Sequence, residues 1–296
     1  MDGRQLEYFV AVAEELNFTR AAVKLFAAQS TVSAGIRSLE QELGATLFDR
    51  STKIISLTAA GSSLLPEARG AIEALDRVRS SVALNSEGLR GRLRIGTFIA
   101  LDAVRLPEIL GEFHRRHPHV DIQLIASPSG STGLSEEVRH GRADVAFAGL
   151  PLSDLASFNV LEVARSPFVA ILPATHPLAA GSEVRLGDLV TERWIDSPAG
   201  YASRIVFDRV LAERGLTRVI SDEVADAGEM PKLVAAGLGI AAIPEIIYRP
   251  AAGVVVRPIV DSDAELVLTV ISRAHPAPAT AAFLALMSDR EQLART

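Results

Sequence analysis

The chain has 296 residues, of which 48% are hydrophobic and 22% charged, and its formal net charge is -6. This length and apolar content allow sizeable cores in two or three domains. The sequence contains no cysteine, which excludes disulfides and thiol chemistry, and its negative charge argues against indiscriminate binding to nucleic acid.

Residues 17–40 have the pattern of two short helices joined by a tight turn. Val32, Ile36 and Leu39 recur at helical spacing in the second helix, which predicts a buried face. The opposite face carries short hydroxyl, amide and guanidinium groups that can reach phosphates and base edges in a major groove. Any two amphipathic helices could share this pattern, but it is typical of a helix-turn-helix. The predicted DNA contacts here are Thr19, Arg20, Gln29, Ser30, Thr31, Ser33 and Arg37.

The next segment, residues 43–61, contains a glycine helix stop at Gly44 and two short β-prone runs. Arg50 and Lys53 lie where these runs meet, and long cations there can reach the DNA backbone or the minor groove. We therefore predict a wing with Arg50 and Lys53 near its tip. Residues 1–61 hold six Lys or Arg against seven Asp or Glu, so binding must depend on geometry and on a second copy of the chain.

From Thr58 to about Glu87 an apolar series at helical spacing predicts one long helix. By its pattern alone, this helix could pack on its own chain. Beyond residue 91, short apolar strands alternate with helices, which indicates an α/β domain. The order of these elements predicts two subdomains with two crossings between them, near residues 162–166 and 260–269.

Two motifs that suggest other chemistry have simpler interpretations. Gly237-x-Gly239-x-x-Ala242 fits a dinucleotide fingerprint only with a strand before it and a helix after it, whereas the predicted order is the reverse. We interpret Gly237 as a helix cap and predict no cofactor. His114, His117 and His119 lie at the end of a predicted helix without cysteines or close carboxylates, so we predict no metal site.

No arrangement of nucleophile, base and orienting group stands out, so we predict no catalytic residue and no enzyme. The single tryptophan, Trp194, lies in a predicted strand and is interpreted as core, with ligand contact as the alternative. The sequence shows no signal peptide pattern and no apolar run near the roughly 20 residues that span a bilayer. We expect a cytoplasmic protein without membrane contact.

A ligand cleft is predicted between the two subdomains, where strands end and helices begin, because free backbone N–H groups and hydroxyls converge there. Each serine in these loops could instead be an ordinary helix cap. Arg204 is the one strong cation in these loops, so we expect a guest with at most one acidic group. The predicted ligand-binding residues are Thr97, Phe98, Ala100, Ser127, Ser129, Thr132, Ser197, Tyr201, Ser203 and Asp226.

Three N-terminal stretches resemble the DNA-binding domain of the LysR-type transcriptional regulators: Leu6-Glu7-Tyr8-Phe9-Val10-Ala11-Val12-Ala13-Glu14-Glu15, the unit from Ala21-Ala22 to Leu39-Glu40, and the wing from Leu47-Phe48-Asp49-Arg50 to Ala60-Gly61. The stretch from Leu233 to Pro244 resembles the effector-binding domain of the same family. The chain departs from the family at Ala28-Gln29-Ser30, where Ser usually precedes the glutamine and Pro often follows it, and at Ser33-Ala34, where Ser-Arg is favoured.

The resemblance implies a winged helix-turn-helix domain at residues 1–61, a linker helix at 62–90 that pairs between subunits, and an α/β effector-binding domain at 91–296. That domain would be similar to type 2 periplasmic solute-binding proteins, with subdomain I at about 91–163 and 268–296 and subdomain II at about 164–267. The dimerisation residues would be Leu64, Ala68, Ile72, Leu75, Val78 and Val82.

The function implied is a DNA-binding transcriptional regulator whose activity is modulated by a small molecule between the subdomains. The expected partners are double-stranded operator DNA, a small organic acid as effector, further copies of the chain in a homodimer or homotetramer, and RNA polymerase. The alternatives are a DNA-binding protein that acts without an effector and an α/β enzyme fused to a helix-turn-helix.

Overall fold

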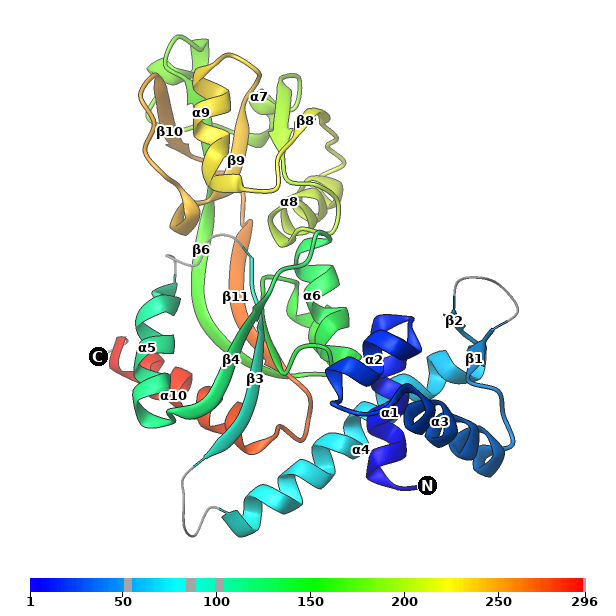
Figure 1. Ribbon diagram of the computed structural model, residues 1–296. Coiled ribbons are helices and arrows are strands. Elements are labelled where there is room, and N and C mark those ends of the chain that lie inside the picture. The colour runs from blue at the N-terminus through cyan, green and yellow to red at the C-terminus, as the bar shows by residue number, and fades with distance from the viewer. Residues whose placement is uncertain (51–54, 84–88, 99–103, 295–296) are drawn as a thin grey trace. The chain divides into compact units, whose positions relative to one another are not determined.

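The computed structural model describes residues 1–50, 55–83, 89–98 and 104–294. The chain forms two compact units, one of residues 1–90 with 139–142 and one of the remaining residues (Figure 1). The predicted site residues Lys53 and Ala100 lie outside the described residues, and the side chain of Val82 is not described either.

The first unit is a winged helix-turn-helix followed by a long helix. Its elements are α1 (Gly3–Glu15), α2 (Phe18–Lys24), α3 (Gln29–Leu43), β1 (Phe48–Asp49), β2 (Ser56–Leu57) and α4 (Ala59–Ala83). Asp2 and Gln5 form a capping box at the start of α1, and Gly44 ends α3 in the left-handed conformation. The apolar faces of the first three helices meet in one core around Phe9 and Ile36. The predicted architecture of this unit is confirmed.

Helix α4 divides the predicted dimerisation seam into two parts. Ala68 is 1% exposed in the core of the unit, and Leu64 and Ile72 pack against the same core. Leu75 and Val78 are 40% and 66% exposed. The first half of the apolar series therefore holds α4 against its own chain, and the second half leaves apolar surface accessible.

The second unit contains the α/β domain. Its strands and helices are β3 (Arg90–Gly96), α5 (Leu106–Arg116), β4 (His119–Ile125), α6 (Gly130–Arg139), β5 (Val145–Ala148), β6 (Asn159–Pro173), α7 (Leu186–Leu189), β7 (Arg193–Asp196), α8 (Ala202–Glu213), β8 (Val219–Glu223), α9 (Met230–Ala235), β9 (Ala241–Pro244), β10 (Val254–Pro258), β11 (Glu265–Ser272) and α10 (Pro278–Ala294). The largest sheet has the order β10-β6-β11-β5-β3-β4, and β9 also pairs with β6. Strands β7 and β8 form a separate parallel pair.

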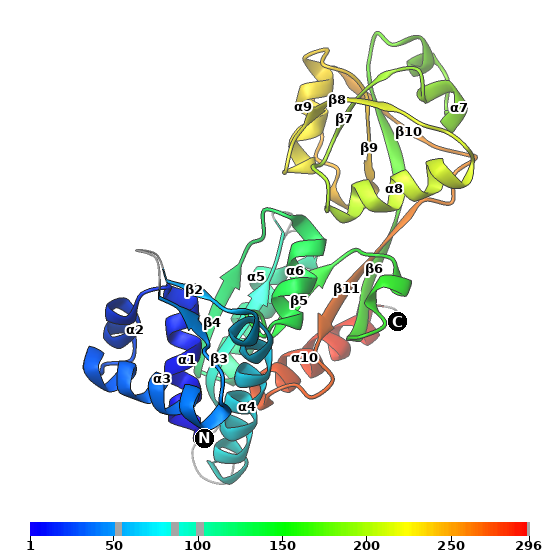
Figure 2. The same cartoon turned by 90° about the vertical axis from the view of Figure 1, so that its right-hand side faces the viewer.

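Two long strands connect the two halves of this unit. Strands β6 and β11 are antiparallel from Pro167 and Glu265 to Asn159 and Ser272, with a register shift between Leu268 and Thr269. Figure 2 shows both strands running from the first subdomain, built around β3, β4, β5, α5, α6 and α10, into the second, built around β7 to β10 and α7 to α9. The sequence predicted only residues 168–172 as a strand, because residues 159–165 are largely half-exposed and lack an apolar run.

The second subdomain has a dense aromatic core. Trp194 is fully buried, and its ring lies 5.6 Å from that of Phe207. Its indole N–H donates to the carbonyl oxygen of Leu189 at 3.1 Å. The interpretation of Trp194 as a core residue is confirmed.

Candidate functional site

The recognition helix α3 presents a polar face on an apolar base. Gln29, Ser30, Thr31 and Arg37 are exposed and Ser33 is half-buried. The helix begins at Gln29 after Ala28, whose side chain cannot cap it, and Ser30 does not take over as the cap. At the start of α2, Thr19 and Arg20 are exposed, and their backbone N–H groups donate to Asn17 Oδ1 at 2.9 and 3.0 Å.

The wing is attached to the recognition helix through Glu40. Its Oε1 accepts hydrogen bonds from the backbone N–H groups of Leu47 at 2.9 Å and Phe48 at 3.4 Å, and its Oε2 accepts one from Arg50 at 3.0 Å. The Arg50 guanidinium also lies 5.0 Å from the ring centroid of Phe18. Arg50 therefore joins the wing to α2 and α3, a role that sequence reasoning missed, while its side chain stays 37% exposed.

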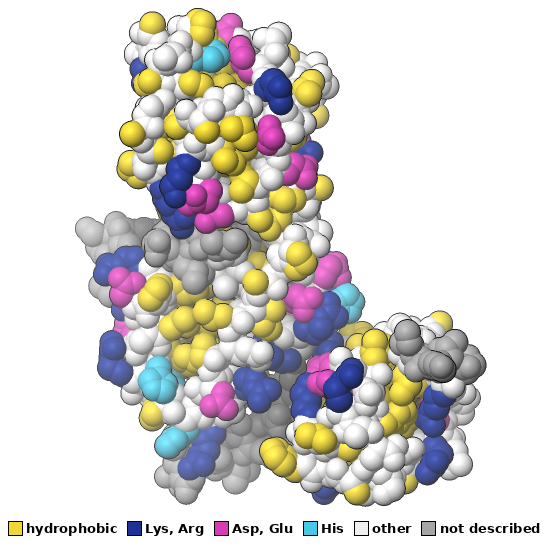
Figure 3. All heavy atoms as spheres, turned by 45° about the horizontal axis from the view of Figure 1, so that its top comes forward, with side chains coloured by type: hydrophobic (Ala, Val, Ile, Leu, Met, Phe, Trp, Pro, Cys, Tyr) yellow, Lys and Arg dark blue, Asp and Glu magenta, His cyan; other side chains and the backbone are white. Residues whose placement is uncertain are grey.

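Several cations of this unit are compensated by nearby carboxylates. Lys24 contacts Glu14 at 2.8 Å and Glu15 at 3.4 Å, and Arg20 contacts Glu15 at 3.3 Å. Burial alone would raise the pKa of Glu14, but hydrogen bonds from Lys24 and Arg69, with the charges of both, hold that pKa below its usual value. Figure 3 shows separate basic patches on the visible face of this unit and no continuous basic surface.

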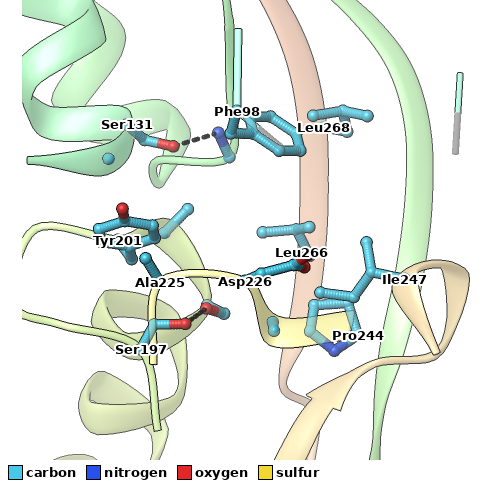
Figure 4. A pocket seen from close by; sticks show the side chains of 15 residues that line it. Phe98, Ser131, Ser197, Tyr201, Ala225, Asp226, Pro244, Ile247, Leu266 and Leu268 are labelled. Carbon is cyan, nitrogen blue, oxygen red and sulfur yellow. Dashed lines mark hydrogen bonds between the residues drawn. The ribbon is translucent and has the colours of Figure 1, made fainter. Parts of the chain in front are cut away.

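A small cavity, partly open to solvent, is lined by residues of both subdomains of the α/β unit. Its walls are mainly apolar, and Figure 4 shows Phe98, Leu268 and Leu266 along one side with Pro244 and Ile247 beyond them. The remaining lining residues are Gly130, Ser131, Gly149, Ser197, Tyr201, Ala202, Ser203, Ala225, Asp226 and Ala227. The cavity therefore suits a compact guest with a substantial apolar part.

Hydroxyl groups form the polar wall of the cavity. Ser197 is 1% exposed, and its Oγ lies 3.2 Å from Ser203 Oγ. Ser131 Oγ accepts a hydrogen bond from the Gly149 N–H at 3.4 Å (Figure 4). Asp226 accepts one from the Gly228 N–H at 2.9 Å and pairs with Arg249 at 3.1 Å, so its charge is compensated. None of the described lining residues is Lys, Arg or His.

The cavity contains half of the predicted ligand-binding residues. Phe98, Ser197, Tyr201, Ser203 and Asp226 line it. Thr97, Ser127, Ser129 and Thr132 are not among its lining residues. Ser127 Oγ accepts from the Ser129 N–H at 3.3 Å, and the Thr132 N–H donates to the Gly200 carbonyl at 3.1 Å.

Arg204, the cation expected near the ligand, faces other partners. It donates to Glu223 at 2.7 Å, to Asp208 at 3.2 Å and to the Ser197 carbonyl at 3.0 Å. The residues that sequence reasoning missed come mostly from segments far apart in the chain. Gly130, Ser131, Ala202 and Ala227 are exceptions, because they lie in the predicted ligand loops.

The described residues meet neither the requirements of a metal site nor those of a membrane span. They contain no group of three or more His, Cys, Asp or Glu placed to hold a metal ion. His117 caps the end of α5, and its ring lies 4.9 Å from that of Phe113. None of the helices in the described ranges combines the length and apolar content that a membrane span needs.

A recognition helix with a wing, joined in one chain to a two-subdomain ligand module, defines a DNA-binding protein with an effector domain. Two family models match it: "Bacterial regulatory helix-turn-helix protein, lysR family" over residues 3–62 and "LysR substrate binding domain" over residues 86–292. The chain belongs to the LysR family of transcriptional regulators.

Individual relatives and structures agree with this assignment. The chain is 37% identical over 243 residues to the HTH-type transcriptional regulator ShiR of Corynebacterium glutamicum (strain R), covering 81% of this chain and 82% of that one. It is 31% identical to the transcriptional dual regulator GltC of Bacillus subtilis (strain 168), over 84% and 82% of the two chains. A full-length OxyR variant from Pseudomonas aeruginosa shares the fold, with a TM-score of 0.79 at 23% identity over 99% and 95% of the two chains. CbnR complexed with its target DNA gives a TM-score of 0.61 at 24% identity, over 98% and 100%.

Proposed function

We propose that the cavity between the subdomains binds the effector of this regulator, and that the effector is a small organic acid with an apolar body and a single acidic group. The observation that carries the proposal is the division of the cavity into an apolar side, with Phe98, Leu266 and Leu268, and a hydroxyl wall, with Ser197 and Ser203. The apolar side would receive the body of the effector and the hydroxyl wall its polar group.

The charge of the effector follows from the groups around it. The cavity has no lining cation among its described residues, so a guest with two carboxylates would leave at least one charge uncompensated. One carboxylate can be held by the Ser197 and Ser203 hydroxyls and by the first N–H groups of α8, which has no side-chain cap at Tyr201. We therefore expect moderate affinity for monoacids.

Calorimetric titration of the full chain with benzoate, a monoacid with an apolar body, tests this proposal, and shikimate, a monoacid with a hydroxylated ring, is the comparison. Shikimate is present in a structure of the effector-binding domain of QuiR, which shares the fold at a TM-score of 0.61 and 18% identity. Ser197→Ala and Ser203→Ala should each weaken binding by about 1 kcal/mol, and Ser63→Ala in α4 should leave it unchanged. Equal affinities in all four proteins would contradict the placement of the effector.

At the DNA, we propose that the exposed face of α3 reads the operator and that Thr19, Arg20, Arg50 and Lys53 contact its backbone. Arg37→Ala and Ser33→Leu should each weaken specific binding by about 1 to 3 kcal/mol and leave binding to scrambled DNA nearly unchanged. Lys53→Ala should weaken binding to both DNAs and reduce its salt dependence. Gel shifts over a salt series distinguish these outcomes, and unchanged affinity in all three variants would refute the proposed interface.

The functional form that we propose is a homodimer or homotetramer that pairs through α4 and acts on RNA polymerase. Residues 1–61 hold six Lys or Arg against seven Asp or Glu, and an operator-binding unit without an excess of basic residues gains most from a second recognition helix on the same DNA. A ligand that favours one angle between the subdomains would then change how the two recognition helices are spaced.

A further inference from the structure

A buried guanidinium lies behind the hydroxyl wall of the cavity. Arg218 directly precedes β8, and its side chain is only 3% exposed. The guanidinium carbon lies 4.8 Å from the ring centroid of Trp194 and 4.8 Å from that of Phe207. A cation that packs over two adjacent aromatic rings in a core has lost most of its hydration, so its retention needs strong local compensation.

That compensation comes from two aspartates on different elements. Arg218 forms a close ion pair with Asp196, at the end of β7, and contacts Asp208 Oδ1, on α8, at 2.7 Å. The Asp196 side chain is also only 3% exposed. In the ion pair, Arg218 Nη2 contacts Asp196 Oδ2, whereas Arg218 Nη1 has no hydrogen-bond partner within the described structure. Buried pairs of this kind contribute little to stability compared with apolar packing, which points to a role other than stability.

Asp196 connects this pair to the cavity. Its Oδ1 accepts a hydrogen bond of 2.6 Å from the backbone N–H of Ser197, the buried serine of the hydroxyl wall. Ser197 in turn pairs with Ser203, at the start of the helix that carries Phe207 and Asp208. Arg218 therefore supports both sides of the hydroxyl wall, the end of β7 and the helix α8.

We propose that Arg218 is a positioning residue for the effector cavity: it compensates the charge of Asp196, and Asp196 then remains buried where it holds Ser197 in the wall. This inference rests on the proposed effector site. Arg218 is not among the residues that line the cavity, and it acts through Asp196.

The charged groups that face Asp196 make the proposal testable by pH. Burial raises the pKa of the Asp196 carboxyl, while Arg218, the Ser197 N–H and Arg204 oppose that rise and Asp208 adds to it. Glu223 is the strand partner of Asp196 in the β7–β8 pair, and its carboxylate forms an ion pair with Arg204. Without Arg218, the pKa of Asp196 should rise further, and near neutral pH the side chain must either take up a proton or leave its buried position.

The experiment compares the full-length wild type with Arg218→Met, Arg218→Lys and the double variant Asp196→Asn with Arg218→Met. Trp194 is the only tryptophan in the chain, so its fluorescence reports on this core directly. Benzoate and shikimate are titrated between about pH 5.5 and pH 8.5, and circular dichroism verifies folding. The wild type should show nearly constant affinity over this range.

Arg218→Met should lose about tenfold in affinity at the alkaline end and recover most of it at the acidic end, where Asp196 is neutral. The double variant should lose this pH dependence, because the asparagine side chain introduced by Asp196→Asn carries no charge and can still accept the Ser197 N–H. Arg218→Lys should keep the constant profile, since it restores the charge. Equal, pH-independent losses in Arg218→Met and the double variant would overturn the proposal and leave Arg218 a packing role only.

A ligand-free measurement separates this inference from the proposed function. The Trp194 fluorescence of Arg218→Met should show a pH transition that the wild type and the double variant lack. If the wild type binds neither acid, the proposed effector class fails, and this transition still decides whether Arg218 compensates Asp196. Its absence would overturn the inference.

Discussion

The backbone N–H of Thr132 donates a hydrogen bond of 3.1 Å to the carbonyl oxygen of Gly200. A loop of the second subdomain therefore binds the first turn of α6, which belongs to the first subdomain. Nearby, Gly149 of the first subdomain faces Ala202 and Leu266, which also line the cavity. The subdomains are therefore in direct contact beside the cavity, and the spacing between them depends on the absence of a side chain at Gly149.

Gly149→Ala should disturb that spacing. A Cβ at this position would lie 2.5 Å from Leu266 Cδ1 and 2.9 Å from Ala202 Cβ, and the second contact cannot be relieved by rotating a side chain. We expect a loss of about 1 to 2 kcal/mol in the affinity for benzoate or shikimate, whichever binds the wild type, with operator binding retained. Calorimetry measures this, and Gly187→Ala is the control because, beyond its chain neighbours and its own helix backbone, no atom lies within 4 Å of its added Cβ. Unchanged affinity in Gly149→Ala would show that the two subdomains can move apart at this contact without loss of binding.

Glu40→Ala should loosen the wing. The substitution removes the acceptor for the Leu47 and Phe48 N–H groups and the partner of Arg50. We expect a decrease of about 1 to 2 kcal/mol in the free energy of unfolding, measured by urea denaturation, and weaker binding to operator DNA. Glu40→Gln keeps an acceptor oxygen and should cost less than half as much. A Glu40→Ala protein with wild-type stability would mean that the wing is held by its apolar contacts alone.

Phe26→Asn should stabilise the helix-turn-helix. Phe26 is fully exposed and has a φ of 51° at the end of α2, where the Phe26 N–H bonds to the Val23 carbonyl and the Ala27 N–H to the Ala22 carbonyl. The same bond pattern ends other helices of this chain with a glycine at Gly44, Gly215 and Gly237. Asn tolerates the left-handed conformation better than Phe, so we expect a gain of about 0.5 to 1 kcal/mol in thermal unfolding. Phe26→Ala keeps a Cβ in the strained left-handed conformation and serves as the control. Equal stability of Phe26→Asn and Phe26→Ala would exclude relief of backbone strain as the cause of the gain.

Val78→Glu should dissociate the oligomer without unfolding its subunits. Val78 is 66% exposed on α4, so a charge there costs little within one chain but would be buried in a helix pair. Sedimentation should show a smaller species, and circular dichroism an unchanged helix content. Ile72→Glu provides the contrast, because Ile72 packs against the core of its own unit and the variant should unfold that unit. A Val78→Glu protein that sediments like the wild type would place the interface elsewhere.

The helix-turn-helix was predictable because its information is local. Val32, Ile36 and Leu39 fix which side of α3 is buried, and the polar face follows from the same period. The cavity was predictable only where its residues lie in loops next to predicted elements, as with Phe98, Ser197 and Asp226.

The rest of the cavity depends on tertiary structure. Leu266 and Leu268 reach it because β11 passes between the subdomains, a path that no local pattern encodes. Ser131 faces inward because α6 starts at Gly130, two residues earlier than the predicted start at Thr132. Arg204 is the one strong cation in the predicted ligand loops, but Glu223 and Asp208 are the partners of its charge in the structure.

The pairing of β6 with β11 also limits how the ligand domain can deform. The two connections between the subdomains are hydrogen-bonded to each other along most of their length, with one irregularity between Leu268 and Thr269. Such a two-stranded ribbon twists more readily than it stretches. We therefore expect the subdomains to rotate through a twist distributed along β6 and β11, and not through bending at a single residue in each strand. The energy of a small rotation is shared among many hydrogen bonds of this pair. A ligand that binds with only a modest preference for one angle between the subdomains can therefore provide that energy.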